Sequence, residues 1–210
     1  MQYDNDMSND LHNLASEGPV NDVFKTIYAR RSIRDYLAED VPDRVIRELI
    51  KAGTYAPSAV NKQPWRFMVI KNRELMKKLS NKAKELWMEQ DVSASNPDII
   101  RLANMIARPD FNIFYNAPLL IMIFANPDAL SPQIDCALAA ENMMLAARSL
   151  GIGSCWIGLA AVLGQVHEIM NELGVPADCR LVGCLIFGYP ARLDLRAPER
   201  EENVILKWIG

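Results

Sequence analysis

One short segment limits the choice of fold more than any other part of this 210-residue chain. From Leu119 to Ala125 the sequence reads Leu-Leu-Ile-Met-Ile-Phe-Ala, without a polar residue. A strand with one solvated face alternates polar and apolar residues, whereas a strand covered on both faces is apolar throughout. The run is also far too short to span a bilayer. We therefore expect a strand that is buried on both faces of a sheet.

Helices and strands are expected to alternate around this one central sheet. Apolar spacing predicts helices over residues 23–28, 42–52, 73–88, 133–150 and 162–173. The expected strands are residues 65–70, 119–125, 154–157, 180–187 and, as the final one, 204–209. Gly53 and Gly151 are expected to end the helices that precede them. The pattern indicates a helix-rich α+β or α/β class.

The chain is expected to form one domain over residues 22–210, preceded by a flexible tail. Residues 1–21 are rich in Asn, Asp and Ser and contain a Gly-Pro break, which also fits an arm ordered by a partner subunit. The helix over 133–150 is nearly apolar and should cross the core or a subunit interface. Residues 91–116 have mixed polarity and predict a loop or short helices over a substrate pocket.

Charge and composition disfavour several classes of function. The net charge of −3 and the isoelectric point near 5.5 argue against a nucleic-acid-binding protein. Only four cysteines and two histidines occur, without a Cys-x-x-Cys pair, so a metal site is not expected. The cysteines lie among apolar or small residues and should be buried, reduced thiols. The polar N-terminal segment has no apolar core, so we expect a cytoplasmic protein without a membrane segment.

A cluster of cations follows the first expected helix. Residues 30–34 read Arg-Arg-Ser-Ile-Arg, placing three guanidinium groups within five positions. Such a cluster is often only a solvated basic surface. Guanidinium groups are also suited to bidentate contacts with a phosphate or with the polar edge of a planar heterocycle. Ser32 adds a small hydrogen-bonding group between them.

A second polar segment lies just before the expected strand at 65–70. Residues 56–65 read Ala-Pro-Ser-Ala-Val-Asn-Lys-Gln-Pro-Trp, which an ordinary surface loop would explain. A rigid loop of this kind can also present several donors and acceptors to a planar ligand. Glu141, on the apolar helix, is interpreted as a structural hydrogen-bonding residue rather than a catalytic acid.

Four segments, in order, resemble the nitroreductase family, which makes the match specific. Residues 29–36 read Ala-Arg-Arg-Ser-Ile-Arg-Asp-Tyr, and residues 56–67 continue the polar loop above to Arg-Phe. Residues 135–142 read Asp-Cys-Ala-Leu-Ala-Ala-Glu-Asn and lead to Leu-Gly-Ile-Gly-Ser-Cys-Trp-Ile-Gly at 150–158. Residues 183–190 read Gly-Cys-Leu-Ile-Phe-Gly-Tyr-Pro. The resemblance covers roughly residues 23–208.

The resemblance implies an α+β fold, the nitroreductase-like α/β sandwich, with a mainly antiparallel central sheet flanked by helices. It implies an intertwined homodimer that holds flavin mononucleotide (FMN) in two clefts at its interface. By similarity, the flavin contacts from one subunit are Arg30, Arg31, Ser32 and Arg34, with Arg30 toward the phosphate and Arg34 toward the pyrimidine edge. Those expected from the other subunit are Pro57, Ser58, Ala59 and Asn61.

The same resemblance assigns the ring-facing backbone and the rest of the phosphate site. Backbone groups expected to face the ring are those of Trp156, Ile157, Gly158 and Leu159, with an N–H near Gly158 or Leu159 addressing flavin N5. A basic residue after Tyr189-Pro190 usually completes the phosphate site. Arg196 and Arg200 both qualify, with a slight preference for Arg196, and spacing does not decide between them.

The implied function is an NAD(P)H-dependent FMN oxidoreductase. NADH or NADPH would donate electrons, and a small electron-poor acceptor such as a nitroaromatic or quinone would receive them in a ping-pong cycle. The flavin would carry the chemistry, so no catalytic side chain is expected. Three alternatives stay open: a same-fold reductive dehalogenase or flavin-breakdown enzyme, a non-catalytic flavin-storage protein, and an unrelated α/β hydrolase or binding module without flavin.

Overall fold

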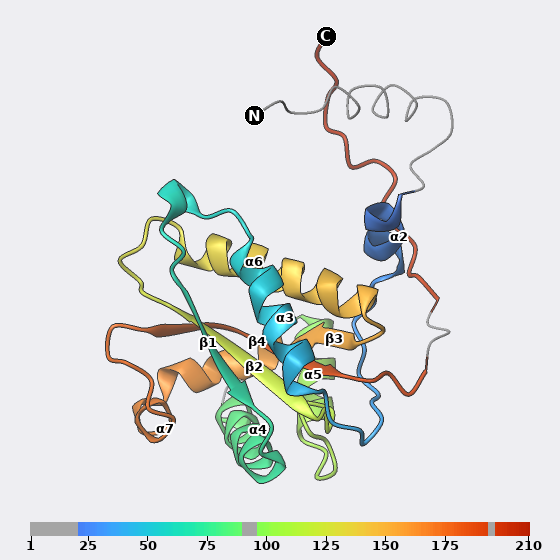
Figure 1. Cartoon of the computed structure of the whole chain (residues 1–210). Helices are drawn as coiled ribbons and strands as arrows, with labels where there is room; N and C mark the ends of the chain where they lie inside the picture. The colour runs from blue at the N-terminus through green and yellow to red at the C-terminus, as the bar shows by residue number, and fades with distance from the viewer. Residues whose placement is uncertain (1–20, 90–95, 193–195) are drawn as a thin grey trace.

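The computed structural model describes residues 21–89, 96–192 and 196–210. Its centre is a four-stranded sheet with the strand order β1-β2-β4-β3, and every neighbouring pair is antiparallel (Figure 1). The strands are β1 (Trp65–Ile70), β2 (Leu119–Ala125), β3 (Gly153–Trp156) and β4 (Arg180–Gly188). The expected α+β fold with a mainly antiparallel sheet is therefore confirmed.

Strand β2 explains why the run 119–125 lacks polar residues. It lies between β1 and β4, and all seven of its residues are buried. Leu119, Ile121 and Ile123 face one apolar core, whereas Leu120 and Met122 face a second core on the opposite side of the sheet. Both faces of this strand are covered, as the sequence predicts.

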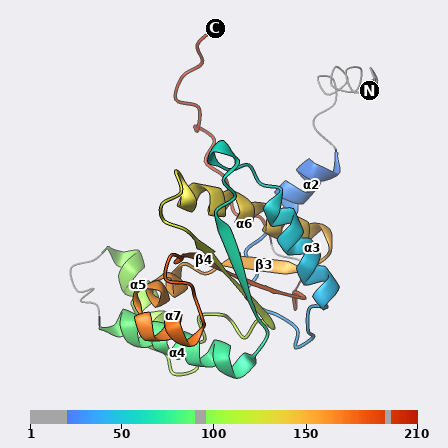
Figure 2. The ribbon, with the colours of Figure 1, turned by 60° about the vertical axis from the view of Figure 1, so that its left-hand side comes forward.

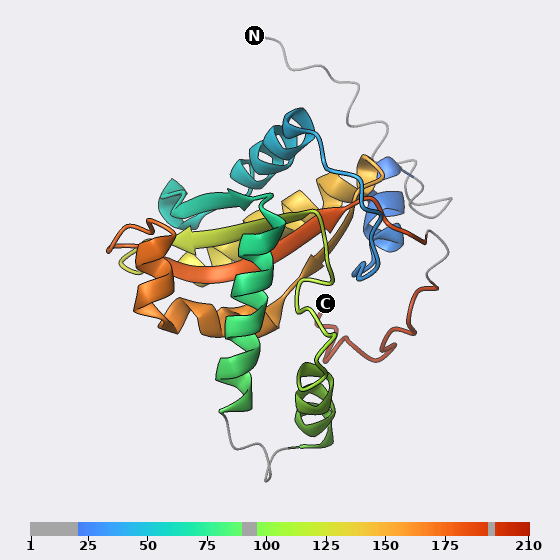
Figure 3. The same ribbon diagram turned by 90° about the horizontal axis from the view of Figure 1, so that it is seen from below.

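Helices supply the two outer layers. On one face lie α3 (Asp43–Thr54) and α6 (Pro132–Ser149), and on the other lie α4 (Arg73–Met88), the 3₁₀ segment η2 (Gly158–Gln165) and α7 (His167–Glu172). Figure 2 shows the two layers from the side, and in Figure 3 α4 crosses in front of the strands. The remaining helical segments are α2 (Asp22–Ala29), η1 (Ala59–Asn61) and α5 (Pro97–Ile106).

Several boundaries agree with the sequence pattern. Strands β1 and β2 and helix α4 have the expected bounds, and α6 and β3 differ from them by one residue at each end. Gly151 follows α6 with a φ of 74°, the left-handed conformation that glycine tolerates. The Ile152 N–H then donates to the Ala147 carbonyl oxygen at 2.8 Å, which closes the end of α6.

Gly53 was expected to stop α3, and this expectation is wrong. The helix continues through Thr54, and Gly53 is buried within it. A Cβ atom at Gly53 would lie 2.8 Å from the Met143 Cγ atom and 3.3 Å from the Ala139 carbonyl oxygen. The glycine is therefore explained by the close approach of α3 and α6 rather than by a helix end.

Two other expected elements also differ. The helix predicted over 162–173 is instead η2 followed by α7, with an extended Val166 between them. Gly164 packs against Leu181 of β4, where a Cβ would lie 3.0 Å from the Leu181 Cβ, and the tighter 3₁₀ turns keep η2 against the sheet. The predicted strand at 204–209 has no strand partner among the described residues, and its apolar side chains are exposed.

The N-terminal helix and the segment 91–116 agree only in part with the sequence pattern. The helix predicted over 23–28 is present as α2, but none of its residues is buried. Within the segment 91–116, residues 97–106 form α5 and turns follow it, whereas positions 90–95 lie outside the described residues. The expected tail also lies outside them, apart from Asn21, which caps α2. Among the described residues, no helix has the length and apolarity needed to cross a membrane.

Candidate functional site

The arginine segment is fixed against the edge of the sheet. Ser32 forms a parallel bridge with Ser154 of β3, and the Ile33 N–H donates to the Ser154 carbonyl oxygen at 2.9 Å. The Tyr36 hydroxyl donates to the Ile33 carbonyl oxygen at 2.7 Å. Because successive side chains of an extended segment point to opposite sides, Ser32 and Arg34 face one cavity and Ile33 faces another.

The first of these cavities gathers all five predicted cationic residues. It has a volume of about 370 Å³ and is lined by Arg30, Arg31, Ser32, Arg34, Arg196, Pro198 and Arg200. Arg196 and Arg200, the two candidates after Tyr189-Pro190, therefore reach the same cavity as the 30–34 segment. The geometry does not choose between Arg196 and Arg200, because each lines the wall. We call this cavity the arginine cavity.

Two of these arginines are held by hydrogen bonds. The Arg30 Nε atom donates to the Glu141 Oε1 atom of α6 at 3.1 Å, which confirms the structural role expected for Glu141. Arg31 donates through one terminal nitrogen to the carbonyl oxygens of Tyr28 and Arg30, at 2.6 and 2.7 Å. The Arg31 Nε atom is buried and has no hydrogen-bond partner among the described residues.

Tyr115 is a neighbour of this site that the sequence reasoning missed. The Arg34 guanidinium carbon lies 5.9 Å from the centre of the Tyr115 ring, within cation–π range. Burial raises the pKa of the Tyr115 hydroxyl, and the positive charge of Arg34 opposes this shift. Tyr115 and Asn116 are both left-handed, with φ values of 52° and 53°. Tyr115 belongs to the segment 91–116 that the sequence predicts over a substrate pocket, and the side chains of Asn112 and Asn116 join at 3.0 Å across its turn.

Tyr36 and Cys155 lie beneath the same segment. Burial raises the pKa of Tyr36 far above its usual range, with the Cys155 charge adding to the shift and Arg34 opposing it. Burial also raises the pKa of Cys155. The positive charge of Arg34, a hydrogen bond with Ser32 and the positive charge of Arg30 each act to lower it. Cys155, Cys136 and Cys184 are buried free thiols, as expected, whereas the free Cys179 is only partly buried.

The predicted ring-facing backbone lies where β3 passes into η2. The Ile157 N–H donates to the Cys184 carbonyl oxygen at 2.8 Å, and the Trp87 indole N–H of α4 donates to the Leu159 carbonyl oxygen at 2.9 Å. These bonds fix the main chain on both sides of Gly158, where an added Cβ would meet no atom within 4 Å. Trp156 precedes this turn and packs over Gly183, where a Cβ would overlap its indole ring.

The second predicted group of contacts forms a rigid loop elsewhere on the molecule. Val60, Asn61 and Gln63 all have left-handed backbones, with φ values of 46°, 55° and 47°. The Ala59 N–H donates to the Asp135 Oδ1 atom at 3.1 Å, and the Gln63 N–H donates to the Ser58 Oγ atom at 3.0 Å. Asp135, in the first turn of α6, is therefore a positioning residue of the loop that the sequence reasoning did not identify.

Within the described part of one chain, the two groups do not share a cavity. The arginine cavity contains none of the four predicted loop contacts, namely Pro57, Ser58, Ala59 and Asn61. Asp135 holds the loop at the start of α6, whereas Arg30 contacts the same helix at Glu141. The site residues predicted from the sequence thus form one assembled cluster, the backbone turn at 156–159 and one separate, preformed loop.

Comparisons with known proteins give a family match, similar relatives and similar solved structures. The model of the "Nitroreductase family" matches residues 27–189. A protein of Archaeoglobus fulgidus, named for a proposed NADH dehydrogenase or NAD(P)H nitroreductase activity, is 32% identical over 176 residues, covering 81% of this chain and 87% of that protein.

A solved structure and a more distant relative extend the comparison. The crystal structure of a Bacteroides fragilis nitroreductase with bound FMN has a TM-score of 0.78 and 29% identity, covering 91% of this chain and all of that one. An iodotyrosine deiodinase of Hydra vulgaris is 25% identical over 186 residues, covering 82% of this chain and 66% of that protein.

Proposed function

This chain belongs to the nitroreductase family, and we propose that it is a homodimeric oxidoreductase that uses FMN to pass electrons from NADH or NADPH to an electron-poor acceptor. The observation that carries the proposal is the arginine cavity, which Arg30, Arg31, Ser32 and Arg34 line together with Arg196 and Arg200. Its donors and charges match the phosphate, ribityl and pyrimidine groups of a flavin nucleotide. The FMN bound in the Bacteroides fragilis relative supports the choice of cofactor.

The residues of the cavity fit FMN in charge and in hydrogen-bond donors. Arg30 and either Arg196 or Arg200 would hold the phosphate, because guanidinium groups bind phosphate oxygens in bidentate pairs. The buried Arg31 Nε atom, which lacks a partner in the described chain, is a further donor for a nucleotide. At the other end of the segment, Arg34 lies beside Tyr115 and would address the polar pyrimidine edge of the ring.

The chain would contribute binding, orientation and charge. When bound, FMN supplies the two-electron chemistry between the donor and the acceptor. Arg34 would stabilise the negative charge that accumulates on the pyrimidine edge, and the N–H near Gly158 or Leu159 would face N5. Trp87 would keep this peptide in place through its bond to Leu159. A nitroaromatic or quinone would enter after the nicotinamide leaves, in a ping-pong order.

A homodimer is part of the proposal because one chain leaves apolar surface uncovered. Val23, Ile27 and Tyr28 of α2 are exposed, and so are Leu206 and Trp208 near the C-terminus. A second copy would cover these residues and bring its loop contacts to the arginine cavity. The compartment that we propose is the cytoplasm, where the four free thiols would stay reduced.

Absorption spectroscopy of the purified protein tests the proposal. Flavin bands that bleach after anaerobic addition of NADH or NADPH would establish a nicotinamide-linked flavoenzyme. Bound flavin that stays oxidised would favour a storage role or another electron donor. Absence of flavin bands, even after incubation with FMN, would contradict the proposal and favour an unrelated binding module.

Reductive dehalogenation is the second candidate, because the Hydra vulgaris relative is named an iodotyrosine deiodinase. The arginine cavity would serve the same cofactor in either reaction, so the acceptor decides between them. The flavin is first reduced with dithionite, and iodotyrosine or a nitroaromatic is then added without oxygen. Faster reoxidation by iodotyrosine, with release of iodide, would favour dehalogenation over nitro or quinone reduction.

A further inference from the structure

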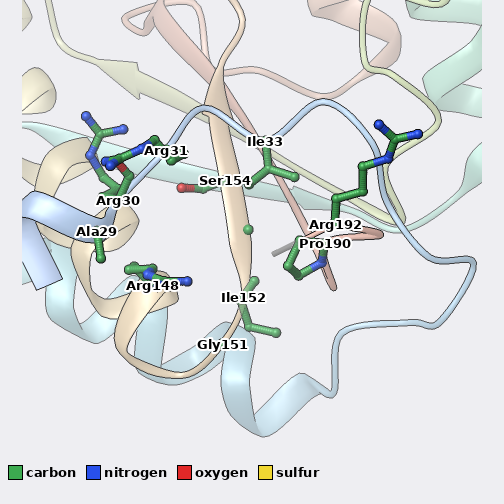
Figure 4. A pocket seen from close by; sticks show the side chains of 11 residues that line it. Ala29, Arg30, Arg31, Ile33, Arg148, Gly151, Ile152, Ser154, Pro190 and Arg192 are labelled. Carbon is green, nitrogen blue, oxygen red and sulfur yellow. The ribbon is translucent and has the colours of Figure 1, made fainter. Parts of the chain in front are cut away.

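A second cavity lies on the opposite side of the arginine segment. It has a volume of about 160 Å³, whereas a single water requires roughly 10–15 Å³. Ile33 faces this cavity, and Ser32 and Arg34 do not line it. Figure 4 shows the side chains of Arg30, Arg31, Arg148 and Arg192 around it, together with Ser154. We call it the rear cavity.

The rear cavity is cationic without acidic groups in its wall. Four arginine residues line it, and none of its lining residues is Asp or Glu. Arg30 is partly compensated by Glu141, and the Arg192 Nε atom lies 4.0 Å from an Asp35 oxygen. Arg31 bonds only to neutral carbonyl oxygens, and Arg148 has no carboxylate partner among the described residues. The lining therefore carries excess positive charge.

The Arg148 side chain is not needed to close the end of its own helix. It stands in the last turn of α6, where the Ile152 and Gly151 N–H groups already bond to the carbonyl oxygens of Ala147 and Arg148, at 2.8 and 3.1 Å. That turn satisfies helix-end carbonyls through the backbone, so the Arg148 side chain is not needed there. Figure 4 shows it extending along the cavity toward Ile152, and the Ser154 hydroxyl points toward Arg30 and Arg31.

We propose that the rear cavity binds a phosphate group, at a site separate from the proposed flavin phosphate site. Guanidinium forks and a hydroxyl are the donor set that phosphate oxygens prefer. Two arginines, Arg30 and Arg31, line both cavities, so the sites share a wall of charge. The phosphate could come from a free inorganic anion or from the 2′-phosphate of an adenine nucleotide, and the test separates these sources.

Calorimetric titration of the full chain with pyrophosphate, at constant ionic strength, tests the site. The flavin spectrum of each variant is recorded first, so loss of FMN, which would contradict the proposed function, is distinguished from loss of the rear site. Arg148→Gln removes a cation that lines only the rear cavity, and Arg148→Lys restores the charge without the fork. Arg44→Gln, at an exposed position of α3, is the matched control.

Saturable binding of pyrophosphate to the wild type and to Arg44→Gln is expected. Arg148→Gln should weaken it at least tenfold, with an intermediate value for Arg148→Lys and unchanged flavin content. A parallel titration with adenosine 2′,5′-bisphosphate and 5′-AMP identifies the source of the phosphate. Tighter binding of the bisphosphate than of pyrophosphate or 5′-AMP indicates a nucleotide. Any other order of affinities indicates a free anion. Equal affinities in Arg148→Gln and Arg44→Gln, no saturable binding to the wild type, or displacement of FMN by pyrophosphate would overturn the proposal.

Discussion

The arginine segment and the loop at 57–63 are predicted to contact the same cofactor. In the structure of one chain, however, only the arginine segment lines the arginine cavity. The segment is bonded to β3 and already forms a cationic cavity with Arg196 and Arg200. The loop is equally well fixed by Asp135, but it exposes Val60 by 71% and lines no part of that cavity. Half of the proposed site is thus assembled within the described part of one chain, and the other half, the loop, is preformed apart from it.

Hybrid dimers test this division most directly and carry the largest expected effect. One chain carries Arg30→Ala with Arg34→Ala, and the other carries Ser58→Ala with Asn61→Ala. If the loop serves the other subunit, the hybrid has one intact site, and we expect it to bind about half of the wild-type flavin. The two homodimers should bind little.

Two different affinity tags allow the hybrid to be purified, and its visible spectrum gives the flavin content. Circular dichroism of both homodimers shows whether the variants are folded. Folded hybrids that bind no more flavin than the homodimers would show that the arginines and the loop do not meet across the interface. A Ser58→Ala, Asn61→Ala homodimer that binds flavin as the wild type does would instead show that the loop is an ordinary surface turn.

Arg34→Ala changes the arginine cavity and leaves the loop at 57–63 intact. A hydrogen bond to a charged group contributes about 1.5–3 kcal/mol, so FMN affinity should fall roughly 10- to 150-fold. The flavin reduction potential should also fall, because the cation that favours the reduced form is absent. Equilibrium binding and a spectroscopic redox titration measure the two effects. If both quantities match those of an Arg44→Ala control, Arg34 has no role at the flavin.

Asp135→Ala weakens the preformed half instead. It removes the acceptor of the Ala59 N–H, and the loss of about 1 kcal/mol should lower FMN affinity roughly fivefold. Asp135→Asn keeps an oxygen at the same position and should bind FMN nearly as the wild type does. The comparison uses fluorescence quenching of FMN during titration. Equal affinities of the alanine and asparagine variants would exclude the Asp135 bond as the cause.

The smallest expected effect is the pH dependence of stability that comes from two buried thiols, Cys136 and Cys155. Burial, with the charge of the adjacent Asp135 adding, raises the pKa of Cys136 to about 12, against about 8.5 for a free thiol. A raised acid pKa gives stability that is present below about pH 8.5 and is lost as pH rises toward 12. Burial raises the pKa of Cys155 as well, but this shift is opposed by Arg34, Ser32 and Arg30.

The free energy of unfolding should therefore fall above about pH 8.5, by at most about 1.4 kcal/mol per pH unit for each such thiol. Cys136→Ala should reduce this slope more than Cys155→Ala does. Urea denaturation between pH 8 and 10 measures both slopes. A larger reduction with Cys155→Ala would mean that the cations do not offset its burial.

The fold could be predicted wherever the pattern is local. The apolar run at 119–125, the period of the helix at 73–88 and Gly151 each depend on nearby residues, and each prediction was confirmed. Gly53 could not be interpreted correctly, because its reason lies in Met143, 90 positions away in the sequence. The split between η2 and α7 likewise depends on contact with β4.

Several residues of the candidate site were identified from the sequence, whereas the residues that contact them were missed. Arg30, Ser32 and Arg34 were identified, and the structure places them in one cavity with Arg196 and Arg200. Asp135 and Tyr115 were missed because their partners, Ala59 and Arg34, are distant in the sequence and belong to other elements. Whether these residues bind flavin stays a prediction until the binding experiments are made.

Strand β2 has a consequence for the way this molecule opens. Its backbone amides pair with β1 on one side and β4 on the other, and its side chains are enclosed on both faces. Local fluctuations that expose a helix or a loop leave such amides protected, so they exchange their hydrogens with solvent only when the whole domain unfolds. Deuterium uptake by residues 119–125 should therefore report global stability, whereas uptake by the loop at 57–63 reports local motion alone.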